Sequence, residues 1–177
     1  MKLIVVSDIH GRYERLIDLM ELHSDADALI FLGDGVRDLY RAGANLYPFT
    51  VYAVKGNCDV SSVFVSDGSK DAPLELTFTL DGFRFYAIHG HSKGVKSSLE
   101  HALATAAKKG ANVLLFGHTH EPVEKYIPAG ENYGGVILAS PLYAFNPGSL
   151  GESRDGKAHF GLIEIRKGEI LFSHGTL

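Results

Sequence analysis

Five short polar clusters, spread from residue 8 to residue 120, constrain most strongly what this chain can fold into. They are Asp8-Ile9-His10-Gly11, Gly33-Asp34, Gly56-Asn57-Cys58-Asp59, His89-Gly90-His91 and Gly117-His118-Thr119-His120. Each lies on or beside a glycine, and three of them directly follow an apolar run typical of a buried strand. Only a fold that gathers several strand ends in one place can bring these side chains together.

The first half of the chain alternates strand-like and helix-like segments. Its pattern predicts buried strands at 3–6, 28–32 and 49–54 and helices at 12–22 and 36–43. This order favours parallel strands with right-handed crossovers. Functional groups of such sheets collect at the carboxyl ends of the strands, where Asp8, Asp34 and Asn57 fall.

The second half is richer in strands. Residues 74–80 alternate apolar and polar side chains, and Asp81-Gly82 predicts a hairpin turn into a strand at 83–88 that ends at His89. We predict a helix at 95–109, a turn at Lys167-Gly168, a polar loop at 61–72 and strands at 113–116, 121–127, 136–138, 160–165 and 170–172. The sum is one α/β domain over residues 1–177, with two sheets and outer helices.

Composition limits the class of protein. With 177 residues, 45% of them hydrophobic, the chain is long enough to bury a sizeable core. A net charge of -4 argues against a broad basic surface for nucleic acids, although it leaves a nucleotide substrate open. One cysteine excludes an internal disulfide, and no signal-peptide or membrane-length apolar run occurs. We therefore expect a cytoplasmic protein that does not bind membranes.

The residue types in the clusters point to metal ions. Carboxylate, imidazole and amide oxygen suit borderline divalent metals such as manganese, iron, cobalt, nickel or zinc. Seven such groups exceed the three or four that one catalytic zinc uses, which favours two metals that share a ligand. Asp34, whose carboxylate has two oxygens, is the natural candidate to be shared. Two metals about 3.5–4 Å apart clamp both oxygens of an in-line displacement at phosphorus.

Each cluster alone also has a structural explanation. Asp8-x-His10 could cap the following helix, Gly33-Asp34 is an ordinary turn, and Asn57 could stabilise a turn through its amide. The histidine pairs past buried strands have no packing rationale, and one shared site explains all five clusters together. Four further histidines lack such a context and are interpreted as surface or structural: His23, His101, His159 and His174.

The order of these blocks resembles that of the calcineurin-like metallophosphoesterase superfamily. Its pattern is Asp-x-His, Gly-Asp, Gly-Asn-His-Asp/Glu, His and Gly-His-x-His, and the resemblance here extends from residue 3 to about residue 150. The small size, the Gly-Asn-Cys-Asp variant, the His-Gly-His block and the segment 145–149 resemble the compact bacterial and archaeal phosphodiesterase branch of YfcE type.

The resemblance implies a four-layer fold, in which two mixed β-sheets pack as a sandwich flanked by helices. It implies one metal held by Asp8, His10 and His120. A second would be held by Asn57, His89 and His118, with Asp34 bridging both. Manganese (Mn²⁺) is expected first, with Ni²⁺, Co²⁺, Fe²⁺ and Zn²⁺ as alternatives.

The implied activity is that of a metal-dependent phosphodiesterase, in which a hydroxide bridging the dinuclear centre attacks phosphorus in line. The substrate would be a small phosphate ester, nucleotides included. We expect no stable nucleic-acid complex, and relatives in this branch suggest a homodimer or homotetramer.

Three residues receive catalytic roles, and one of them, Asn57, is also an implied metal ligand. His91 and the amide of Asn57 are placed to contact the substrate phosphate. Cys58 stands where many members have a histidine that protonates the leaving group, a role worth about 10²–10⁴ in rate. A thiol with a reference pKa of about 8.5 is a different donor, which predicts a preference for good leaving groups or water as the acid. The segment 146–149 closes a wall of the pocket or is a simple Pro-Gly turn.

Two other functions remain open at this point. A phosphomonoesterase or nucleotidase would use the same metals. A protein-binding scaffold is the role of the retromer subunit with this fold, whose metal site is altered. The full set of expected ligands disfavours the scaffold, because an unused site would be free to lose them.

Overall fold

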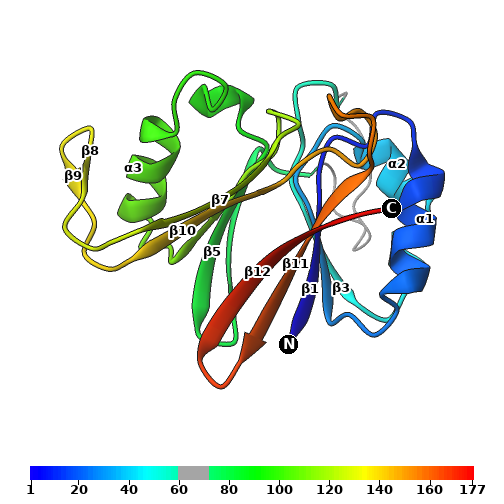
Figure 1. Cartoon of the computed structure of the whole chain (residues 1–177), viewed down its shortest axis with the longest axis horizontal. Coiled ribbons are helices and arrows are strands. Elements are labelled where there is room, and N and C mark those ends of the chain that lie inside the picture. The colour runs from blue at the N-terminus through cyan, green and yellow to red at the C-terminus, as the bar shows by residue number, and fades with distance from the viewer. Residues whose placement is uncertain (60–71) are drawn as a thin grey trace.

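Two five-stranded sheets form the centre of the computed structural model, which describes residues 1–59 and 72–177 (Figure 1). All but the last residue of the predicted loop at 61–72 lies outside the described residues. The first sheet has the order β12-β11-β1-β2-β3. Its strands are β1 (Lys2–Val6), β2 (Ala28–Phe31), β3 (Thr50–Ala53), β11 (His159–Arg166) and β12 (Glu169–Thr176).

The second sheet has the order β4-β5-β6-β10-β7. Its strands are β4 (Glu75–Leu80), β5 (Phe83–Ile88), β6 (Val113–Leu115), β7 (Pro122–Ile127) and β10 (Leu142–Pro147). Both sheets are mixed: β1, β2 and β3 are parallel and β11 is antiparallel to β1, while β5, β6 and β10 are parallel and β4 and β7 are antiparallel to them. A small hairpin of β8 (Asn132–Tyr133) and β9 (Val136–Ile137) stands apart.

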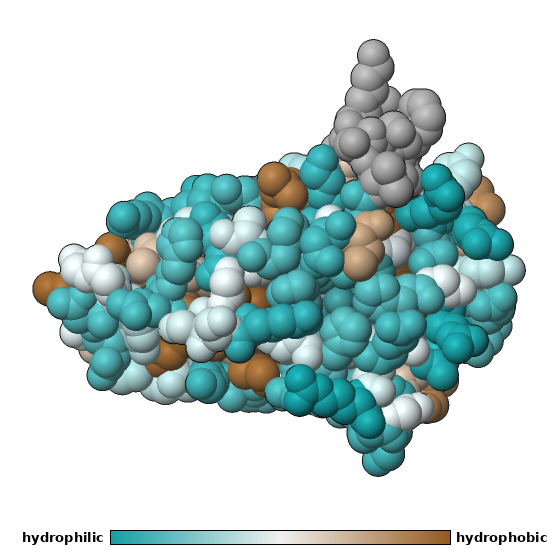
Figure 2. Space-filling model, turned by 90° about the horizontal axis from the view of Figure 1, so that it is seen from above, coloured by the Kyte–Doolittle hydropathy of each residue, from teal (hydrophilic) through white to brown (hydrophobic). Residues whose placement is uncertain are grey.

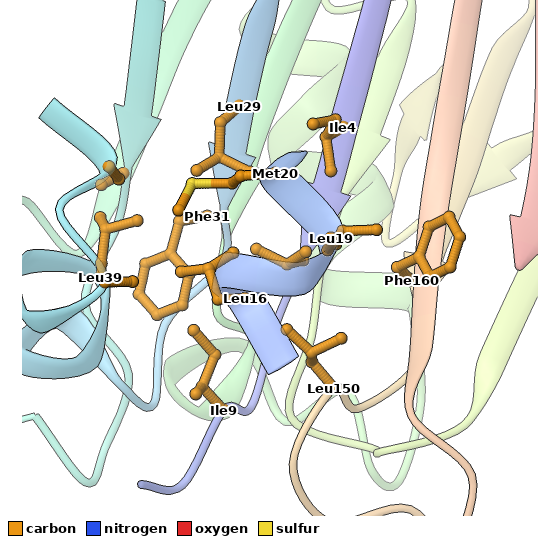
Figure 3. Close-up of a cluster of buried hydrophobic side chains, with 14 of the residues drawn as sticks. Ile4, Ile9, Leu16, Leu19, Met20, Leu29, Phe31, Leu39, Leu150 and Phe160 are labelled. Atoms are coloured by element: carbon orange, nitrogen blue, oxygen red, sulfur yellow. The ribbon is translucent and has the colours of Figure 1, made fainter. Parts of the chain in front are cut away.

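Three hydrophobic clusters hold four layers together. Because side chains alternate along a strand, Leu3 and Val5 of β1 face the second sheet, whereas Ile4 and Val6 face the helices α1 (Tyr13–Leu22) and α2 (Val36–Arg41). Figure 3 shows α1 packed on the first sheet in this way. Helix α3 (Glu100–Lys108) covers the outer face of the second sheet. The structure therefore confirms a sandwich of two mixed sheets flanked by helices.

Some observed element boundaries differ from those predicted from the sequence. The predicted helix at 95–109 begins only at Glu100. The 3₁₀ turn η2 (His91–Lys93) ends at Gly94, which has a left-handed conformation, and residues 95–99 form no helix. A second 3₁₀ turn, η1 (Ala44–Leu46), follows α2. The segment 136–138 contributes only to the small hairpin. No helix in the described part of the chain has the length and apolar character needed to cross a bilayer.

Strand β10 was missing from the prediction, which placed a turn at 146–149. The strand lies between β6 and β7, and Asn146 and Pro147 belong to it; only Gly148, with φ 86°, begins a turn. The four apolar residues at 142–145 lie between Pro141 and Asn146-Pro147, and these prolines argue against a strand in the sequence.

Candidate metal centre

The five polar clusters lie at one end of the molecule, on the loops that follow β1, β2, β3, β5 and β6. The parallel strands place these loops side by side, and backbone hydrogen bonds join them: Asp8 N donates to Gly33 O at 2.9 Å and Gly117 N to His89 O at 3.0 Å. Figure 2 looks onto this end, whose surface is mostly hydrophilic. The five clusters that the sequence singled out therefore come together at one end of the sandwich.

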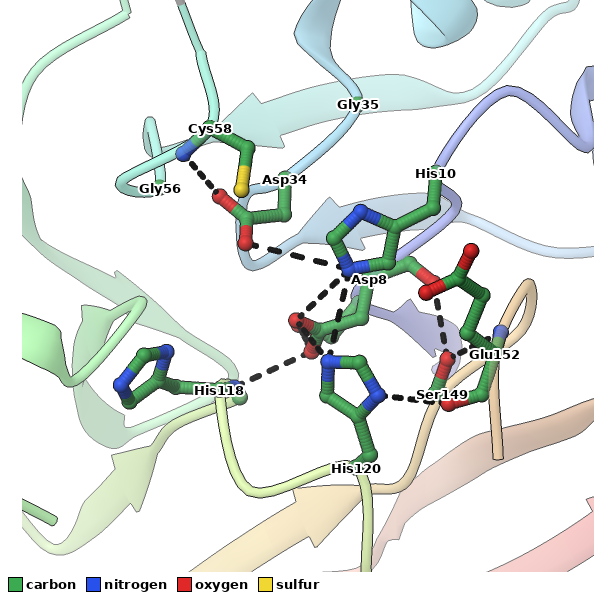
Figure 4. A network of polar contacts seen from close by, with 12 residues as sticks. Asp8, His10, Asp34, Gly35, Gly56, Cys58, His118, His120, Ser149 and Glu152 are labelled. Atoms are coloured by element: carbon green, nitrogen blue, oxygen red, sulfur yellow. Dashed lines mark hydrogen bonds and ion pairs between the residues drawn. The ribbon is translucent and has the colours of Figure 1, made fainter. Parts of the chain in front are cut away.

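Asp8, His10 and His120 form the first group of predicted ligands. Asp8 Oδ1 lies 3.2 Å from His120 Nε2 and 3.7 Å from His10 Nε2, and the two Nε2 atoms are 3.4 Å apart. Figure 4 shows the three side chains pointing toward one another. One carboxylate oxygen and two imidazole nitrogens thus face a common point.

Asn57, His89 and His118 form the second group. His89 Nε2 lies 3.1 Å from Asn57 Oδ1 and 3.1 Å from His118 Nδ1. The other ring nitrogen of His89, Nδ1, lies 2.8 Å from the carbonyl oxygen of Leu32, which fixes the ring and directs Nε2 into the site.

Asp34 stands between the two groups. Its Oδ2 atom is 3.3 Å from His89 Nε2 in the second group and 3.9 Å from His10 Nε2 in the first. Its Oδ1 atom accepts a hydrogen bond of 2.8 Å from Cys58 N, which holds the carboxylate in place. A buried carboxylate in this position can be shared between both groups.

The donor set fits two divalent ions. Donors that share an ion at about 2.1 Å lie about 3–4 Å apart, as the atoms of each group do. Asp8 Oδ1 is buried and has no hydrogen-bond partner among the described residues, although a buried carboxylate oxygen is costly to leave unpaired. An ion bound between Asp8, His10 and His120 would satisfy it.

The carboxylates and imidazoles of the site shift one another's pKa values. Burial would raise the pKa of Asp8, but contact with the His10 and His120 rings outweighs it and holds the pKa well below its usual range. Contact with Asp8 raises the pKa of both His10 and His120. Burial would likewise raise the pKa of Asp34, yet His89 lowers it to about 2. In each case a carboxylate is stabilised by imidazoles that would share a metal ion with it.

His118 behaves differently from the other histidines of the centre. Burial lowers its pKa to about 4, helped by the charges of His89 and Lys96. Burial would also lower the pKa of His89, but its contacts with Asp34 raise it. His118 is therefore already neutral, as a ligand must be, at physiological pH.

Backbone strain is concentrated on the predicted ligands. Positive φ angles occur at five of the seven: Asp8 (54°), His10 (47°), Asp34 (58°), His118 (68°) and His120 (62°). The other non-glycine residues of this kind in the described chain are Asp81 and Lys167, both in hairpin turns as the sequence predicted. Most residues with a side chain avoid positive φ angles for steric reasons, and such angles persist where contacts with the rest of the fold hold them. The turns thus aim the ligands at some cost in stability.

Two glycines of the clusters have a steric reason. A Cβ atom at Gly56 would collide with Asp34 Oδ1, and one at Gly117 would collide with the Ser7 hydroxyl beside Asp8. Both carboxylates therefore approach the neighbouring loop more closely than any other residue would permit.

Asp59 supports the centre in a way that the sequence did not reveal. Its Oδ2 atom accepts hydrogen bonds from the backbone N–H groups of Asp34 (2.9 Å) and Gly56 (2.8 Å). Its Oδ1 atom accepts those of Gly35 (2.9 Å) and Val36 (2.8 Å) at the start of α2. One carboxylate thus ties the loop of Asp34 to that of Asn57. Asp59 was recognised only as a member of its cluster.

Three more polar residues of the support were not predicted as such. Ser7 Oγ donates to Asp8 Oδ2, and the buried Ser149 Oγ donates to Asp8 O at 2.8 Å. Asn146 Nδ2 donates to Gly117 O and to Thr119 Oγ1, both at 3.0 Å. The segment 146–149 therefore braces the ligand loops from behind. The polar residues Asn146 and Ser149 on either side of Pro147-Gly148 were the available signal in the sequence.

Of the predicted catalytic residues, Asn57 belongs to the second group, and His91 and Cys58 lie beside the groups. The His91 ring centroid is 5.5 Å from that of His89 and 6.2 Å from that of His118. Cys58 is exposed, and Asn57 Nδ2 donates to its sulfur at 3.3 Å. Partial loss of solvent around the sulfur and the nearby Asp34 carboxylate raise the pKa of the Cys58 thiol to about 11. The thiol is therefore neutral near pH 7 and a weak acid.

A pocket of about 230 Å³ opens beside the first group. It is lined by His10, Gly11, Asp34, Gly35, Arg37, Asp38, Cys58 and Asp59. The four histidines interpreted as structural lie outside the ligand groups of the described residues. Of these, His174 stacks on Phe145 and His159 pairs with Asp155.

Comparisons with known proteins agree with this geometry. Residues 1–168 match the model of the calcineurin-like phosphoesterase superfamily domain. The probable metallophosphoesterase YsnB of Bacillus subtilis is 32% identical over 85% of this chain and 75% of its own. The phosphodiesterase YfcE of Escherichia coli is 30% identical over 93% of this chain and 88% of its own.

Solved structures share the fold. An archaeal phosphodiesterase superposes with a TM-score of 0.71 at 20% identity and covers 100% of both chains. Vacuolar protein sorting 29 of Cryptosporidium parvum also has a TM-score of 0.71, at 15% identity, over 99% of this chain and 97% of its own. The match of the family model over nearly the whole chain, together with the two curated relatives, shows that this protein belongs to the calcineurin-like phosphoesterase superfamily, in its YfcE-like branch.

Proposed function

We propose that the protein is a phosphodiesterase that depends on two divalent metal ions. The observation that carries the proposal is the position of Asp34, whose Oδ2 atom faces His10 of one group at 3.9 Å and His89 of the other at 3.3 Å. A carboxylate between two sets of imidazoles serves to hold two cations close together. Such a pair is suited to displacement at phosphorus.

The roles of the side chains follow from their positions. Asp8, His10 and His120 would hold one ion, Asn57, His89 and His118 the other, and Asp34 both. When bound, the ions supply positive charge to the phosphoryl oxygens and acidify the attacking water. Asn57 Nδ2 and the His91 ring lie beside the second group, where they can donate to a bound phosphate.

Cleavage of diesters rather than monoesters is supported by the relatives and by the space around the centre. YfcE of Escherichia coli and the archaeal structural neighbour are both described as phosphodiesterases. The pocket that runs past Cys58 and Arg37 leaves room for a second ester group. Parallel assays on bis(p-nitrophenyl) phosphate and p-nitrophenyl phosphate test this preference. We expect the diester to be hydrolysed faster; faster hydrolysis of the monoester would identify a phosphomonoesterase.

The Asp34→Asn variant tests the shared carboxylate. Removing its charge should lower diesterase activity by about 100-fold or more and reduce the bound metal from two ions per chain. Activity and metal content would be measured after reconstitution with Mn²⁺, and then with Ni²⁺, Co²⁺, Fe²⁺ and Zn²⁺. Asp18→Asn, on the exposed face of α1, is the matched control. Wild-type activity and metal content in Asp34→Asn would contradict the proposal.

A further inference from the structure

A second pocket, of about 290 Å³, is lined by residues that precede α3, residues that follow β6 and residues of β7. Its apolar lining comes from the buried Val95 and Phe116 and the half-buried Leu99 and Val123. We call it the lysine pocket, because Lys96 and Lys125 are exposed at its walls. A volume of this size suits one arm of a substrate rather than a whole large ligand.

The lysine pocket is positively charged in a protein of net charge -4. Its ionic residues are Lys96, Lys125, Arg154 and Glu121. Arg154 Nη1 pairs with Glu121 Oε1 at 2.6 Å, which cancels one charge of each sign. Neither lysine forms an ion pair with another described residue. Two ammonium groups thus remain available above an apolar floor.

The lysine pocket and the metal centre share one loop, the segment that follows β6. Thr119, which lines the pocket, stands between His118 and His120, one predicted ligand of each ion. Asn146 Nδ2 donates to Thr119 Oγ1 at 3.0 Å and so fixes this wall. A phosphodiester bound at the centre would extend one ester arm past Thr119.

We propose that the lysine pocket binds an ester arm whose apolar body carries a second anionic group, as in a nucleotide with a further phosphate. The apolar floor would take the body of the arm, and Lys96 and Lys125 would take its charge. This assignment rests on the proposed phosphodiesterase function and narrows its substrates. The metal centre acts on the scissile phosphate, whereas the lysine pocket selects among diesters.

Two substrates that differ only in the second charge test the proposal. They are thymidine 5′-(p-nitrophenyl phosphate) and the same compound with a 3′-phosphate. The manganese-loaded wild type should favour the 3′-phosphorylated substrate about tenfold in kcat/KM, the effect expected of two favourable charge contacts. Lys96→Met and Lys125→Met should each reduce this ratio, and the double variant should bring it to about one. Methionine retains the apolar stem of lysine.

The matched control is Lys108→Met, which removes an exposed lysine of α3 outside the pocket and should leave the ratio unchanged. Calorimetry with thymidine 3′,5′-bisphosphate and thymidine 5′-monophosphate gives a readout that needs no turnover. The bisphosphate should bind more tightly to the wild type, and this difference should vanish in the double variant.

Several outcomes would contradict the proposed role of the lysine pocket. It fails if the wild type shows no preference for the second phosphate, or if the double variant retains the full preference in both measurements. It also fails if Lys108→Met lowers the ratio as much as the pocket variants do. Hydrolysis of bis(p-nitrophenyl) phosphate by the wild type reports separately on the proposed phosphodiesterase function.

Discussion

At the scale of single residues, Cys58 stands where the superfamily pattern given by the resemblance has a histidine. The thiol is exposed beside the pocket, its pKa is raised to about 11, and its sulfur accepts a hydrogen bond from Asn57. Asp59, the next residue, already accepts four backbone hydrogen bonds and has little capacity left to orient an acid. Leaving-group protonation therefore has no well-oriented donor at position 58.

Cys58→His should restore part of that function. We expect kcat for an alkyl phosphodiester to rise by about tenfold, below the full range for a positioned general acid because no free carboxylate orients the imidazole. Aryl diesters, whose leaving groups need no proton, should change little. Steady-state rates on both substrates would measure the difference, with Cys58→Ser as the control for losing the thiol. An equal effect on both classes would contradict this interpretation.

At the scale of structural elements, the loops are held by polar contacts that span several strands. The Asp59 carboxylate joins the loop after β3 to the loop after β2 and to the first turn of α2. Asn146 on β10 and Ser149 beyond it brace the loops after β6 and β1. The ligands are thus positioned by neighbouring elements rather than by their own turns alone.

Asp59→Asn should weaken this link. An amide nitrogen cannot accept a hydrogen bond, so two of the four backbone N–H groups lose their acceptor whichever way the amide is oriented. We expect a loss of about 2–3 kcal/mol in unfolding free energy and metal binding weakened by about 10–100-fold. Denaturant unfolding and metal titration would measure both effects, with Asp18→Asn as the control. Unchanged metal affinity would show that the Asp34 loop is held without Asp59.

At the scale of the whole molecule, the metal centre couples stability to pH. The pKa values of His10, His89 and His120 are raised in the metal-free protein. A raised folded pKa contributes stability that is fully present below the unfolded value of about 6.5 and is lost as pH rises through the folded value. Metal ions require the neutral imidazoles, so binding releases these protons and strengthens with pH.

The Tm without metal and the gain in Tm on adding metal should therefore change in opposite directions as the pH rises. Between about pH 7.5 and pH 9, above the range in which the lowered pKa of His118 makes stability rise with pH, the Tm of the chelator-treated protein should fall, while the increase in Tm on adding Mn²⁺ should grow. The same scans on His10→Asn, which removes one of the raised groups, should show a shallower fall without metal. A metal-free Tm that rises over this range would contradict the proposed origin of the shifts.

Two expectations about the whole molecule stay predictions. The structure describes one chain, so a homodimer or homotetramer awaits sedimentation analysis. The domain limits of 1–177 likewise await limited proteolysis.

Much of the architecture was predictable because its signals are local. Buried runs such as 28–32 and alternation at 74–80 identified strands, and Asp81-Gly82 identified a hairpin turn. Strand β10 and the late start of α3 were not predictable, because each is decided by neighbours. Strand β10 follows Pro141 and ends at Pro147, and its pairing with β6 and β7 holds it in the sheet; the residues after η2 form no helix until α3 begins at Glu100.

The sequence by itself determined the residue types and their order, since metal chemistry demands carboxylate and imidazole and these stand at strand ends. Only the tertiary structure decided how they meet. It places Asp34 between the two groups, assigns Asp59 and Asn146 to their support, and opens a cationic pocket beside Thr119. The physical reason is that these contacts join residues far apart in the chain, and their distances exist only once both sheets have packed.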